Sequence, residues 1–364
     1  MRLVVTGGGT GGHVYPAIEV ALAGQSEGWD VRYLGSLRGQ EGSACSKVGV
    51  SFTGFPAEPV YRLHTVQGMR RLSKLLRASK MARESLEVLR PDAVFATGGY
   101  SAAPILNAAR KLGIPMVLHE QNTVPGRTNK IMSRSAKAVC TVFHAAAKHF
   151  PASLVHRTGL PIRQALRNSS QGRLLMESDT GSAAPRVLVM GGSQGSAALN
   201  DLALSTAFRM TNADVQWLHL TGLGHFESTM ETLRKMGMKP GYTIKAYLEA
   251  EEMASAIFSS SVAFCRSGAG SLAELAAHRK PSVLVPYPYA FERHQHANAA
   301  EFVAMGAADM IDESEIDSAK LEARLLSWIY DKDRAAEAQR ALAEWDVPDS
   351  VPRILDIVRE AAKT

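Results

Sequence analysis

Two kinds of residue near the start of this chain have types and spacing suited to binding phosphate and moving a proton. The stretch VVTGGGTGGHVYPA surrounds Thr10 with glycines and then places His13 directly after them. Glycines after a strand let the backbone approach a ligand, and the next helix offers unpaired N–H groups and a positive dipole end. We therefore expect a phosphate here. His13 stands where a neutral imidazole could accept a proton from a hydroxyl, with capping or packing as the alternative.

The same glycines also satisfy a different pattern. Gly7, Gly9 and Gly12 match G-x-G-x-x-G, the dinucleotide fingerprint, which also needs an acidic residue at the end of the second strand to bind the ribose. The corresponding strand, VRYLGS, ends in Gly35 and Ser36. The sequence therefore disfavours NAD binding.

A second glycine turn repeats this arrangement later in the chain. The segment VLVMGGSQGSAALN, residues 187–200, predicts a strand, a glycine turn with Ser193 at its tight point, and a helix. Ligands of open α/β sheets bind at the carboxyl ends of the strands, so two such turns predict two anion sites on facing edges of one cleft. This arrangement suits an enzyme that transfers a group between two phosphate-bearing substrates.

A third strand and turn bring a carboxylate into the same region. In FCRSGAGSLAELAAHRKPSVLVP, residues 264–286, Ser271 and Glu274 fit the spacing S-x-x-E. One interpretation is a capping box at the start of the helix. The other is that Glu274 accepts hydrogen bonds from both hydroxyls of a ribose. Both remain open from the spacing alone.

Polar residues follow several other expected strands. In the segment 286–302, His294, Gln295 and Asn298 occupy the first turns of a helix, where amides could bind sugar hydroxyls or simply form a polar helix start. The segment VLHEQN, residues 117–122, ends a strand in polar side chains. Of these, His119, Glu120 and Asn122 either face the cleft or pair with one another.

Metal and redox chemistry have little support. The chain lacks H-E-x-x-H, paired cysteines and G-K-[ST], and the one D-x-D triplet, residues 331–333, is interpreted as surface. Cys45, Cys140 and Cys265 are isolated, which indicates buried thiols in a reducing, cytoplasmic compartment. We expect neither a metal nor a cofactor.

The elements that must position these residues form two domains. A chain of 364 residues, 46% of them apolar, exceeds the comfortable size of one core. Two series of apolar runs alternate with helical patterns, which predicts two doubly wound α/β domains with parallel sheets. The expected strands begin near residues 2, 30, 92, 114 and 137 in the first series and near 186, 214, 242, 262 and 281 in the second. A Ser- and Gly-rich linker is expected within residues 159–185, and Pro16 is expected in the first turn of the first helix.

Charge is unevenly divided along the chain. The net charge is +6, yet residues 1–163 carry 21 Lys and Arg against 9 Asp and Glu. Within residues 61–91, basic side chains at 70, 71, 74, 77, 80 and 83 alternate with Met69, Leu72, Leu75, Leu76 and Met81. A basic amphipathic helix favours an anionic membrane surface. An ordinary solvated face or a nucleic-acid surface is the alternative.

Seven segments of this chain occur in one family in the same order: GGTGGHVYPA, GGYSAAP, LHEQN, GLPIR, GGSQG, CRSGAGSLAEL and RHQHANA. Over essentially its whole length the chain resembles the MurG family, bacterial transferases that move N-acetylglucosamine from a UDP donor onto lipid I in peptidoglycan synthesis. The resemblance implies the GT-B fold, two Rossmann-like domains facing a cleft, and no metal. It implies an acceptor and membrane-binding domain over residues 1–160, with a C-terminal helix (347–364) packed back on it, and a UDP-GlcNAc-binding domain over 161–346.

The resemblance also assigns roles to individual residues. The donor-binding positions are Thr10, Gly11, Gly12, Asn122, Arg163, Ser193, Leu248, Ala269, Gly270, Ser271, Leu272, Ala273, Glu274, His294, Gln295 and Asn298. The acceptor-binding positions are Gly9, Thr10, Gly11, Tyr100, Ser101 and Glu120. Two positions depart from the usual family residues: Leu160 replaces an Asn, and His294 replaces a frequent Gln.

The implied mechanism is one inverting displacement. The C4 hydroxyl of the muramoyl sugar loses its proton to His13 and attacks the anomeric carbon as UDP leaves. The resemblance implies a peripheral enzyme at the cytoplasmic face of the cell membrane, with UDP-GlcNAc, lipid I and the membrane surface as partners and no nucleic acid. A glycosyltransferase of the same architecture with a diacylglycerol or natural-product acceptor, and a non-catalytic nucleotide-sugar sensor, are the alternatives.

Overall fold

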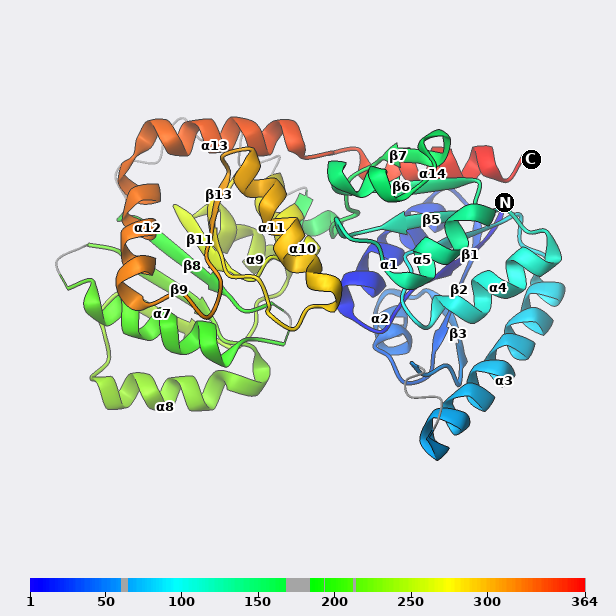
Figure 1. Cartoon of the computed structure of the whole chain (residues 1–364), viewed down its shortest axis with the longest axis horizontal. Helices are drawn as coiled ribbons and strands as arrows, with labels where there is room; N and C mark the ends of the chain where they lie inside the picture. Colours follow the sequence, from blue (N-terminus) through cyan, green and yellow to red (C-terminus); the bar gives the residue numbers. More distant parts are fainter. Residues whose placement is uncertain (60–64, 168–183, 193, 212–213, 364) are drawn as a thin grey trace. The chain divides into compact units, whose positions relative to one another are not determined.

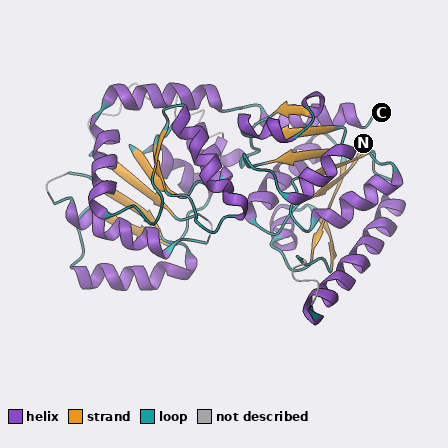
Figure 2. Cartoon of the chain, viewed as in Figure 1, coloured by secondary structure: helices purple, strands orange, loops and turns teal. Residues whose placement is uncertain are grey.

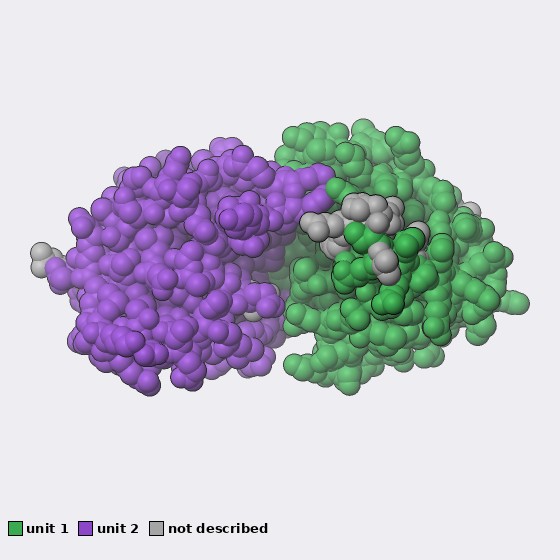
Figure 3. Space-filling model, turned by 60° about the horizontal axis from the view of Figure 1, so that its bottom comes forward, with its two compact units in different colours: residues 1–162, 349–364 green, residues 163–348 purple. Residues whose placement is uncertain are grey.

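The computed structural model describes residues 1–59, 65–167, 184–192, 194–211 and 214–363. The chain divides into two compact units, coloured separately in Figure 3: unit 1 comprises residues 1–162 and 349–364, and unit 2 comprises residues 163–348. Most of the linker expected at residues 159–185 lies outside the described part of the chain.

Unit 1 is built on a seven-stranded parallel sheet. The strand order is β3 (Ser51–Phe55), β2 (Asp30–Ser36), β1 (Arg2–Thr6), β4 (Ala93–Ala96), β5 (Met116–Glu120), β6 (Ala138–Thr141) and β7 (Val155–Arg157). The helices are α1 (Gly11–Ser26), α2 (Glu41–Val48), α3 (Val66–Leu89), α4 (Ala102–Leu112), α5 (Arg127–Met132) and α14 (Ser350–Ala361), with short 3₁₀ turns η1 (Ser133–Ser135), η2 (His144–His149) and η3 (Ala152–Leu154) (Figures 1 and 2).

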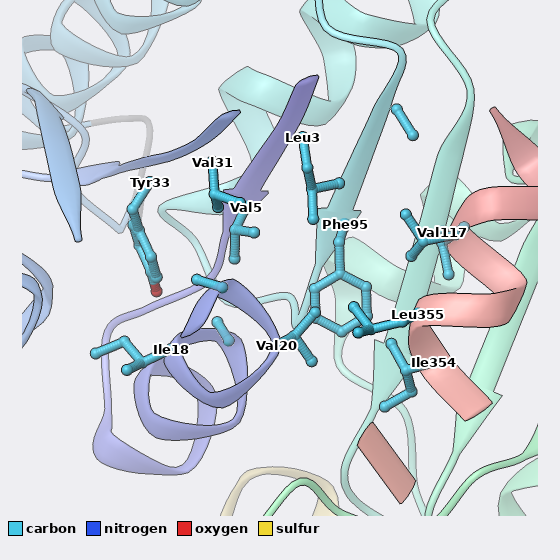
Figure 4. Packing of buried hydrophobic residues seen from close by; sticks show 14 of the residues in the cluster. Leu3, Val5, Ile18, Val20, Val31, Tyr33, Phe95, Val117, Ile354 and Leu355 are labelled. Atoms are coloured by element: carbon cyan, nitrogen blue, oxygen red, sulfur yellow. The ribbon is translucent and has the colours of Figure 1, made fainter. Parts of the chain in front are cut away.

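Side chains of this sheet alternate between two cores, because successive residues of a strand point to opposite faces. Leu3 and Val5 of β1 belong to one core, and Val4, between them, belongs to the other. Figure 4 shows the first core, where Phe95 of β4 lies among residues of β1, α1 and α14. Helices therefore cover both faces of the sheet, as a doubly wound fold requires.

The last helix belongs to unit 1 although it follows all of unit 2 in sequence. Ile354, Leu355 and Val358 of α14 are buried in the core that contains α1, and α14 contacts α1, β4, β5 and β6. Arg359 adds an ion pair with Glu27, at 2.7 Å, at the end of α1.

Unit 2 repeats the architecture with six parallel strands. The order is β10 (Tyr242–Lys245), β9 (Gln216–Leu220), β8 (Arg186–Met190), β11 (Val262–Cys265), β12 (Ser282–Leu284) and β13 (Ala308–Met310). The helices are α7 (Ala197–Arg209), α8 (Phe226–Met236), α9 (Ala250–Phe258), α10 (Ala269–Ala277), α11 (His294–Ala304), α12 (Ser318–Tyr330) and α13 (Lys332–Trp345), with 3₁₀ turns η4 (Leu223–His225) and η5 (Phe291–Arg293).

Each sheet has one point where the strand order reverses. In unit 1 the chain runs outward from β1 to β2 and β3 on one side and from β4 onward on the other, so the reversal lies between β1 and β4. In unit 2 the reversal lies between β8 and β11. Loops leaving two such strands diverge and open a crevice at the carboxyl edge, which is where open α/β sheets bind ligands.

The predicted fold class is confirmed, with two doubly wound parallel sheets. The expectation for Pro16 was wrong: α1 begins at Gly11, so Pro16 lies in its second turn. The helix starts early because the carbonyl of Thr10 already accepts from the N–H groups of His13 and Val14. The three cysteines are buried as predicted.

Candidate functional site

The first glycine loop, residues 7–12, connects β1 to α1 at the reversal point of unit 1. Thr10 caps α1 with extended backbone, and its side chain makes no capping hydrogen bond, so it does not cover the N–H groups of the first turn. Gly9 has a φ of +96°, and a Cβ there would lie 2.8 Å from the Tyr100 ring. The loop thus needs glycine both for its conformation and for the approach of Tyr100.

His13 has a defined tautomer. Its Nδ1 lies 2.9 Å from the carbonyl oxygen of Thr97, the residue after β4. A carbonyl oxygen can only accept, so Nδ1 carries the proton and Nε2 is the ring nitrogen that can take one up. The ring is half-buried. No sequence pattern assigned a role to Thr97, which directly precedes the segment GGYSAAP.

The loop after β4 packs directly on the first glycine loop. The N–H of Gly8 donates to the carbonyl of Gly98 at 3.3 Å, and Gly99 has a φ of +82°. A Cβ on Gly99 would lie 2.1 Å from the carbonyl oxygen of Gly8. The glycine pair of GGYSAAP is therefore required for close contact between the two loops.

The polar segment after β5 binds mainly to itself. The Glu120 carboxylate is buried and accepts hydrogen bonds from the N–H groups of Asn122 and Gly126, at 3.0 and 3.1 Å, and from Nδ2 of Asn129 at 2.9 Å. Burial raises the pKa of Glu120, and these hydrogen bonds oppose the rise. Of the two interpretations left open, mutual structural pairing is the one that the structure contains.

Two further polar residues at this edge are also internal. His119 is fully buried, with Nε2 3.0 Å from the carbonyl of Gly159, and burial lowers the pKa of His119 to about 4. The Ser101 hydroxyl is buried as well. The side chains of Ser101 and Glu120, both expected at the acceptor, are therefore buried at this edge rather than exposed on its surface.

In unit 2 the second glycine loop, residues 191–196, leaves β8 at the reversal point. Ser193, the expected diphosphate residue, lies outside the described residues. Gly195 has a φ of +76°, and a Cβ there would lie 2.2 Å from the carbonyl oxygen of Thr221. Ser196 caps α7 by accepting from the N–H of Leu199 at 3.4 Å. The turn thus presents its backbone at a helix N-terminus, as anion sites do.

The next loop places Glu274 beside an arginine. Helix α10 begins at Ala269 with Gly268 as its cap, so Ser271 lies inside the helix and the alternative capping box is not formed. Glu274 Oε1 instead lies 3.7 Å from Nη2 of Arg163, with both side chains half-buried. Desolvation raises the pKa of Glu274, and the charge of Arg163 opposes that rise.

Arg266 connects the loops on the two sides of the reversal point. Its Nη2 donates to Ser196 Oγ at 2.9 Å and forms an ion pair with Glu313, while its Nη1 donates to the carbonyls of Val285 and Pro286 at 3.2 Å. Sequence reasoning missed this residue, although it stands in the quoted motif CRSGAG. A buried arginine needs such partners, but no sequence signal identifies them.

The expected sugar-binding residues differ in accessibility. Gln295 is half-buried, and its Oε1 accepts from the N–H of Tyr287 at 3.0 Å. The Asn298 side chain is fully buried, and its Nδ2 donates to the carbonyl of Ser267 at 3.2 Å. His294 Nδ1 lies 2.9 Å from the carbonyl of Phe291. Gln295 and His294 are thus accessible, whereas Asn298 supports the loop from inside.

Other expected donor residues fall into two groups. Leu248, Ala269, Leu272 and Ala273 have buried side chains, whereas Gly270 and Ser271 are half-buried. Thr10, Gly11, Gly12 and Asn122 belong to unit 1, and the remaining donor positions belong to unit 2. A hollow of about 580 Å³ between α11 and α12, lined by His296, Asp312 and Arg324 among others, includes none of the expected donor residues.

The basic helix of the sequence is α3. Ala78, Ala82 and Leu86 bury one face in the second core, where α3 packs mainly against α4, whereas Met69 and Leu76 are 57% and 64% exposed. The basic residues are not equivalent. Those at positions 71 and 74 form ion pairs with Glu58, and those at 80 and 83 pair with acidic residues one turn later.

Arg70 and Arg77 have no ion pair within the described part of the chain, and Arg77 neighbours the exposed Leu76. No helix among the described residues is long and apolar enough to cross a membrane. The same residues contain no group of three His, Cys, Asp or Glu side chains that could hold a metal.

Comparisons with known proteins find the same family in both units. The glycosyltransferase family 28 N-terminal domain matches residues 3–141, and the C-terminal domain of that family matches residues 186–354. A relative from Bacillus licheniformis named UDP-N-acetylglucosamine--N-acetylmuramyl-(pentapeptide) pyrophosphoryl-undecaprenol N-acetylglucosamine transferase is 33% identical over 362 residues, which cover 99% of this chain and 98% of the relative.

Solved structures extend the comparison to the fold. The crystal structure of Acinetobacter baumannii MurG aligns with a TM-score of 0.80 at 28% identity, covering 99% of each chain. UDP-GlcNAc 2-epimerase from Neisseria meningitidis, bound to UDP-GlcNAc, aligns with a TM-score of 0.69 at 12% identity, covering 99% of this chain and all of the other. At that identity the likeness is one of fold.

Proposed function

The chain belongs to glycosyltransferase family 28, and from this premise we propose that it transfers N-acetylglucosamine from UDP-N-acetylglucosamine to the muramoyl sugar of lipid I, which forms lipid II for peptidoglycan. The observation that carries this function is the likeness to the Bacillus licheniformis transferase over the full length of both chains. It includes both units, so neither substrate site rests on a partial match.

The donor is proposed to bind unit 2 at its reversal point. The second glycine loop and the N-terminus of α7 would bind the diphosphate, with Ser193 and Arg163 nearby. The N–H groups at the start of α10 would lie along the nucleotide, and Glu274 would accept from the ribose hydroxyls. An ionised carboxylate suits two hydroxyl donors, and Arg163 at 3.7 Å favours its ionised form.

The sugar of the donor is proposed to contact Gln295 and His294, the two accessible polar side chains at the start of α11. Asn298 would support the sugar site without contacting the sugar, because its buried amide donates to the carbonyl of Ser267. A second hydrogen bond joins the loop before α10 to α11, since Ser267 Oγ donates to the carbonyl of Gln295 at 2.8 Å.

The acceptor is proposed to bind unit 1, with its diphosphate on the first glycine loop and the N-terminus of α1. Such a helix end contributes about 0.3 to 2 kcal/mol toward an anion, so it cannot act alone. Thr10, within this loop, and Tyr100, whose ring lies beside Gly9, would contact the acceptor. Glu120 and Ser101 would maintain the shape of the edge from inside.

Transfer is proposed to be one inverting displacement with His13 as the base. Nε2 of His13 takes the proton of the acceptor C4 hydroxyl, and the oxygen forms a bond with the anomeric carbon. The bond from that carbon to the diphosphate oxygen breaks, and its electron pair leaves with UDP. The tautomer defined by Thr97 supports this role, because it leaves Nε2 as the proton acceptor.

The enzyme is proposed to act as a peripheral protein at the cytoplasmic face of the membrane, with α3 as the contact. Met69 and Leu76 would enter the headgroup region, and Arg70 and Arg77 would bind anionic lipid. These residues are favoured over Arg71 and Lys74, which already pair with Glu58. Exposed apolar side chains beside cations that form no ion pair with the described residues are the pattern of an interfacial helix.

The deciding experiment measures UDP release by the full chain on anionic vesicles that carry lipid I. Matched vesicles carry diacylglycerol instead, and a third set carries no acceptor. Release that depends on lipid I, together with formation of the disaccharide lipid, supports the proposal. Release only with diacylglycerol would indicate another acceptor class, and bound donor that is never consumed would indicate a sensor.

A further inference from the structure

Thr97 contacts His13 at two points. Its carbonyl oxygen accepts from Nδ1 of His13 at 2.9 Å, and its Oγ1 donates to the carbonyl oxygen of His13 at 2.8 Å. The first contact fixes the proton on Nδ1, and the second fixes the peptide from which the ring projects. Thr97 is fully buried and His13 is half-buried, so both hydrogen bonds are partly shielded from water.

The backbone around the Thr97 hydroxyl is shaped to fit it. A Cβ on Gly7 would lie 1.7 Å from Oγ1 of Thr97, so the hydroxyl occupies the space that any larger residue at position 7 would need. The N–H of Thr97 donates to the carbonyl of Thr6 at 2.9 Å, which places the residue directly beside the end of β1. The contact therefore joins the two strands at the reversal point of the sheet.

We propose that Thr97 is a positioning residue for the transfer reaction, holding the His13 imidazole as its Nδ1-protonated neutral tautomer so that Nε2 faces the acceptor hydroxyl. The inference rests on the proposed role of His13 as base. Thr97 contacts none of the reacting atoms and acts only through His13. A glycine loop cannot hold the ring alone, because glycine leaves the backbone with the most freedom.

The test separates positioning from general stability. Thr97→Val keeps the shape of the side chain and removes the hydroxyl, whereas Thr97→Ser keeps the hydroxyl. Thr206→Val is the matched control, since Thr206 is equally buried and its Oγ1 donates to the carbonyl of Leu202 at 2.7 Å in unit 2. We expect Thr97→Val to lower kcat roughly 2- to 12-fold, the range for one lost hydrogen bond.

Further measurements distinguish a positioning role of Thr97 from a purely structural one. The KM for UDP-N-acetylglucosamine should stay unchanged in Thr97→Val, Thr97→Ser should restore kcat, and Thr206→Val should leave kcat at the wild-type value. Nitrogen-15 NMR of histidine-labelled protein, with His13 assigned by its absence in His13→Gln, should show the Nδ1-protonated tautomer in the wild-type chain.

Three outcomes would overturn the inference. The first is an Nε2-protonated His13 in the wild-type chain, a result that does not depend on any Thr97 variant folding. The second is a kcat of Thr97→Val equal to that of Thr206→Val, or a loss that Thr97→Ser shares. The third is full turnover in His13→Gln, which would refute the base itself. Loss of turnover in His13→Gln with normal turnover in Thr97→Val would refute only the role of Thr97.

Discussion

Glu274 offers the sharpest test of the proposed donor site, because its carboxylate would distinguish ribose from deoxyribose. A hydrogen bond to a charged group contributes about 1.5 to 3 kcal/mol, so losing the contact with one ribose hydroxyl should weaken binding roughly 10- to 150-fold. The measurement is calorimetric titration of UDP and 2′-deoxy-UDP into the wild-type chain and Glu274→Ala. We expect the wild type to prefer UDP by that factor and Glu274→Ala to show almost no preference.

The ratio of the two affinities isolates the ribose contact. Removing Glu274 also leaves Arg163, 3.7 Å away, without this partner, which changes the affinity for any diphosphate. Both nucleotides carry the same diphosphate, so that effect cancels in the ratio. Glu252→Gln is the matched control, because Glu252 is exposed on α9 of the same unit. A preference in Glu274→Ala as strong as in the wild type would refute the assignment of Glu274 to the ribose.

The same ratio should depend on pH with a defined sign. Only the ionised carboxylate makes charge-assisted hydrogen bonds, so the preference for UDP is present above the pKa of Glu274 and declines as pH falls through it. Burial raises that pKa above the ordinary value for glutamate. The preference should therefore begin to decline at a higher pH than an exposed glutamate would produce. In Glu274→Gln the ratio should not vary with pH.

Three further predictions concern other parts of the chain. His13→Ala should lower kcat by about 100-fold or more in the vesicle assay with both substrates saturating, because proton transfer to a positioned base contributes that much; near-normal turnover would eliminate the base. Arg70→Gln with Arg77→Gln should weaken sedimentation with anionic vesicles about 30-fold, at about 1 kcal/mol for each basic residue near the surface; an equal loss in the control Arg209→Gln with Lys235→Gln would show a general charge effect. Burial lowers the pKa of His219 to about 3. Between about pH 6.5 and 3 the unfolded chain therefore binds more protons at this residue than the folded chain, and the free energy of unfolding decreases as pH falls through that range. Urea unfolding between pH 7 and 5 should therefore lose about 2 kcal/mol less in His219→Gln than in the wild type, and equal losses would contradict this account.

Sequence patterns predicted the central strands of both sheets and one edge strand, β10, but missed the other three edge strands. The missed strands are β3, β7 and β13, each of which lies at the end of its sheet. Central parallel strands are buried on both faces and appear as continuous apolar runs. Edge strands are covered less completely, as the alternating exposure of Ser51–Phe55 illustrates. A short, partly exposed run such as this one lacks the apolar signal that identified the others.

Features of the site that depend on local backbone conformation could be predicted from the sequence. Features that depend on hydrogen-bond partners from other segments could not. Glycine loops before helices follow from local sequence, and both occur as expected. Spacing alone left Glu274 between a capping box and a ligand contact, because the start of α10 depends on where the backbone leaves β11. Similarly, the place of Glu120 at the end of a strand did not reveal that its carboxylate binds Asn122, Gly126 and Asn129 inside the fold. Hydrogen-bond partners of this kind depend on tertiary contacts that spacing does not encode.

The two units brace their glycine loops in the same way but with different chemistry. In each unit a residue after the strand across the reversal point holds the loop: Thr97 binds His13 in unit 1, and Arg266 binds Ser196 in unit 2. Such bracing offsets the backbone freedom of glycine. The neutral carbonyl and hydroxyl of Thr97 leave an imidazole able to accept a proton, whereas the guanidinium of Arg266 is paired with Glu313 and fixes Ser196 at the start of α7 by donating to its Oγ. Thr97 thus acts on a side chain that is proposed as the base, whereas Arg266 acts on a helix N-terminus that is proposed to bind the diphosphate of the donor.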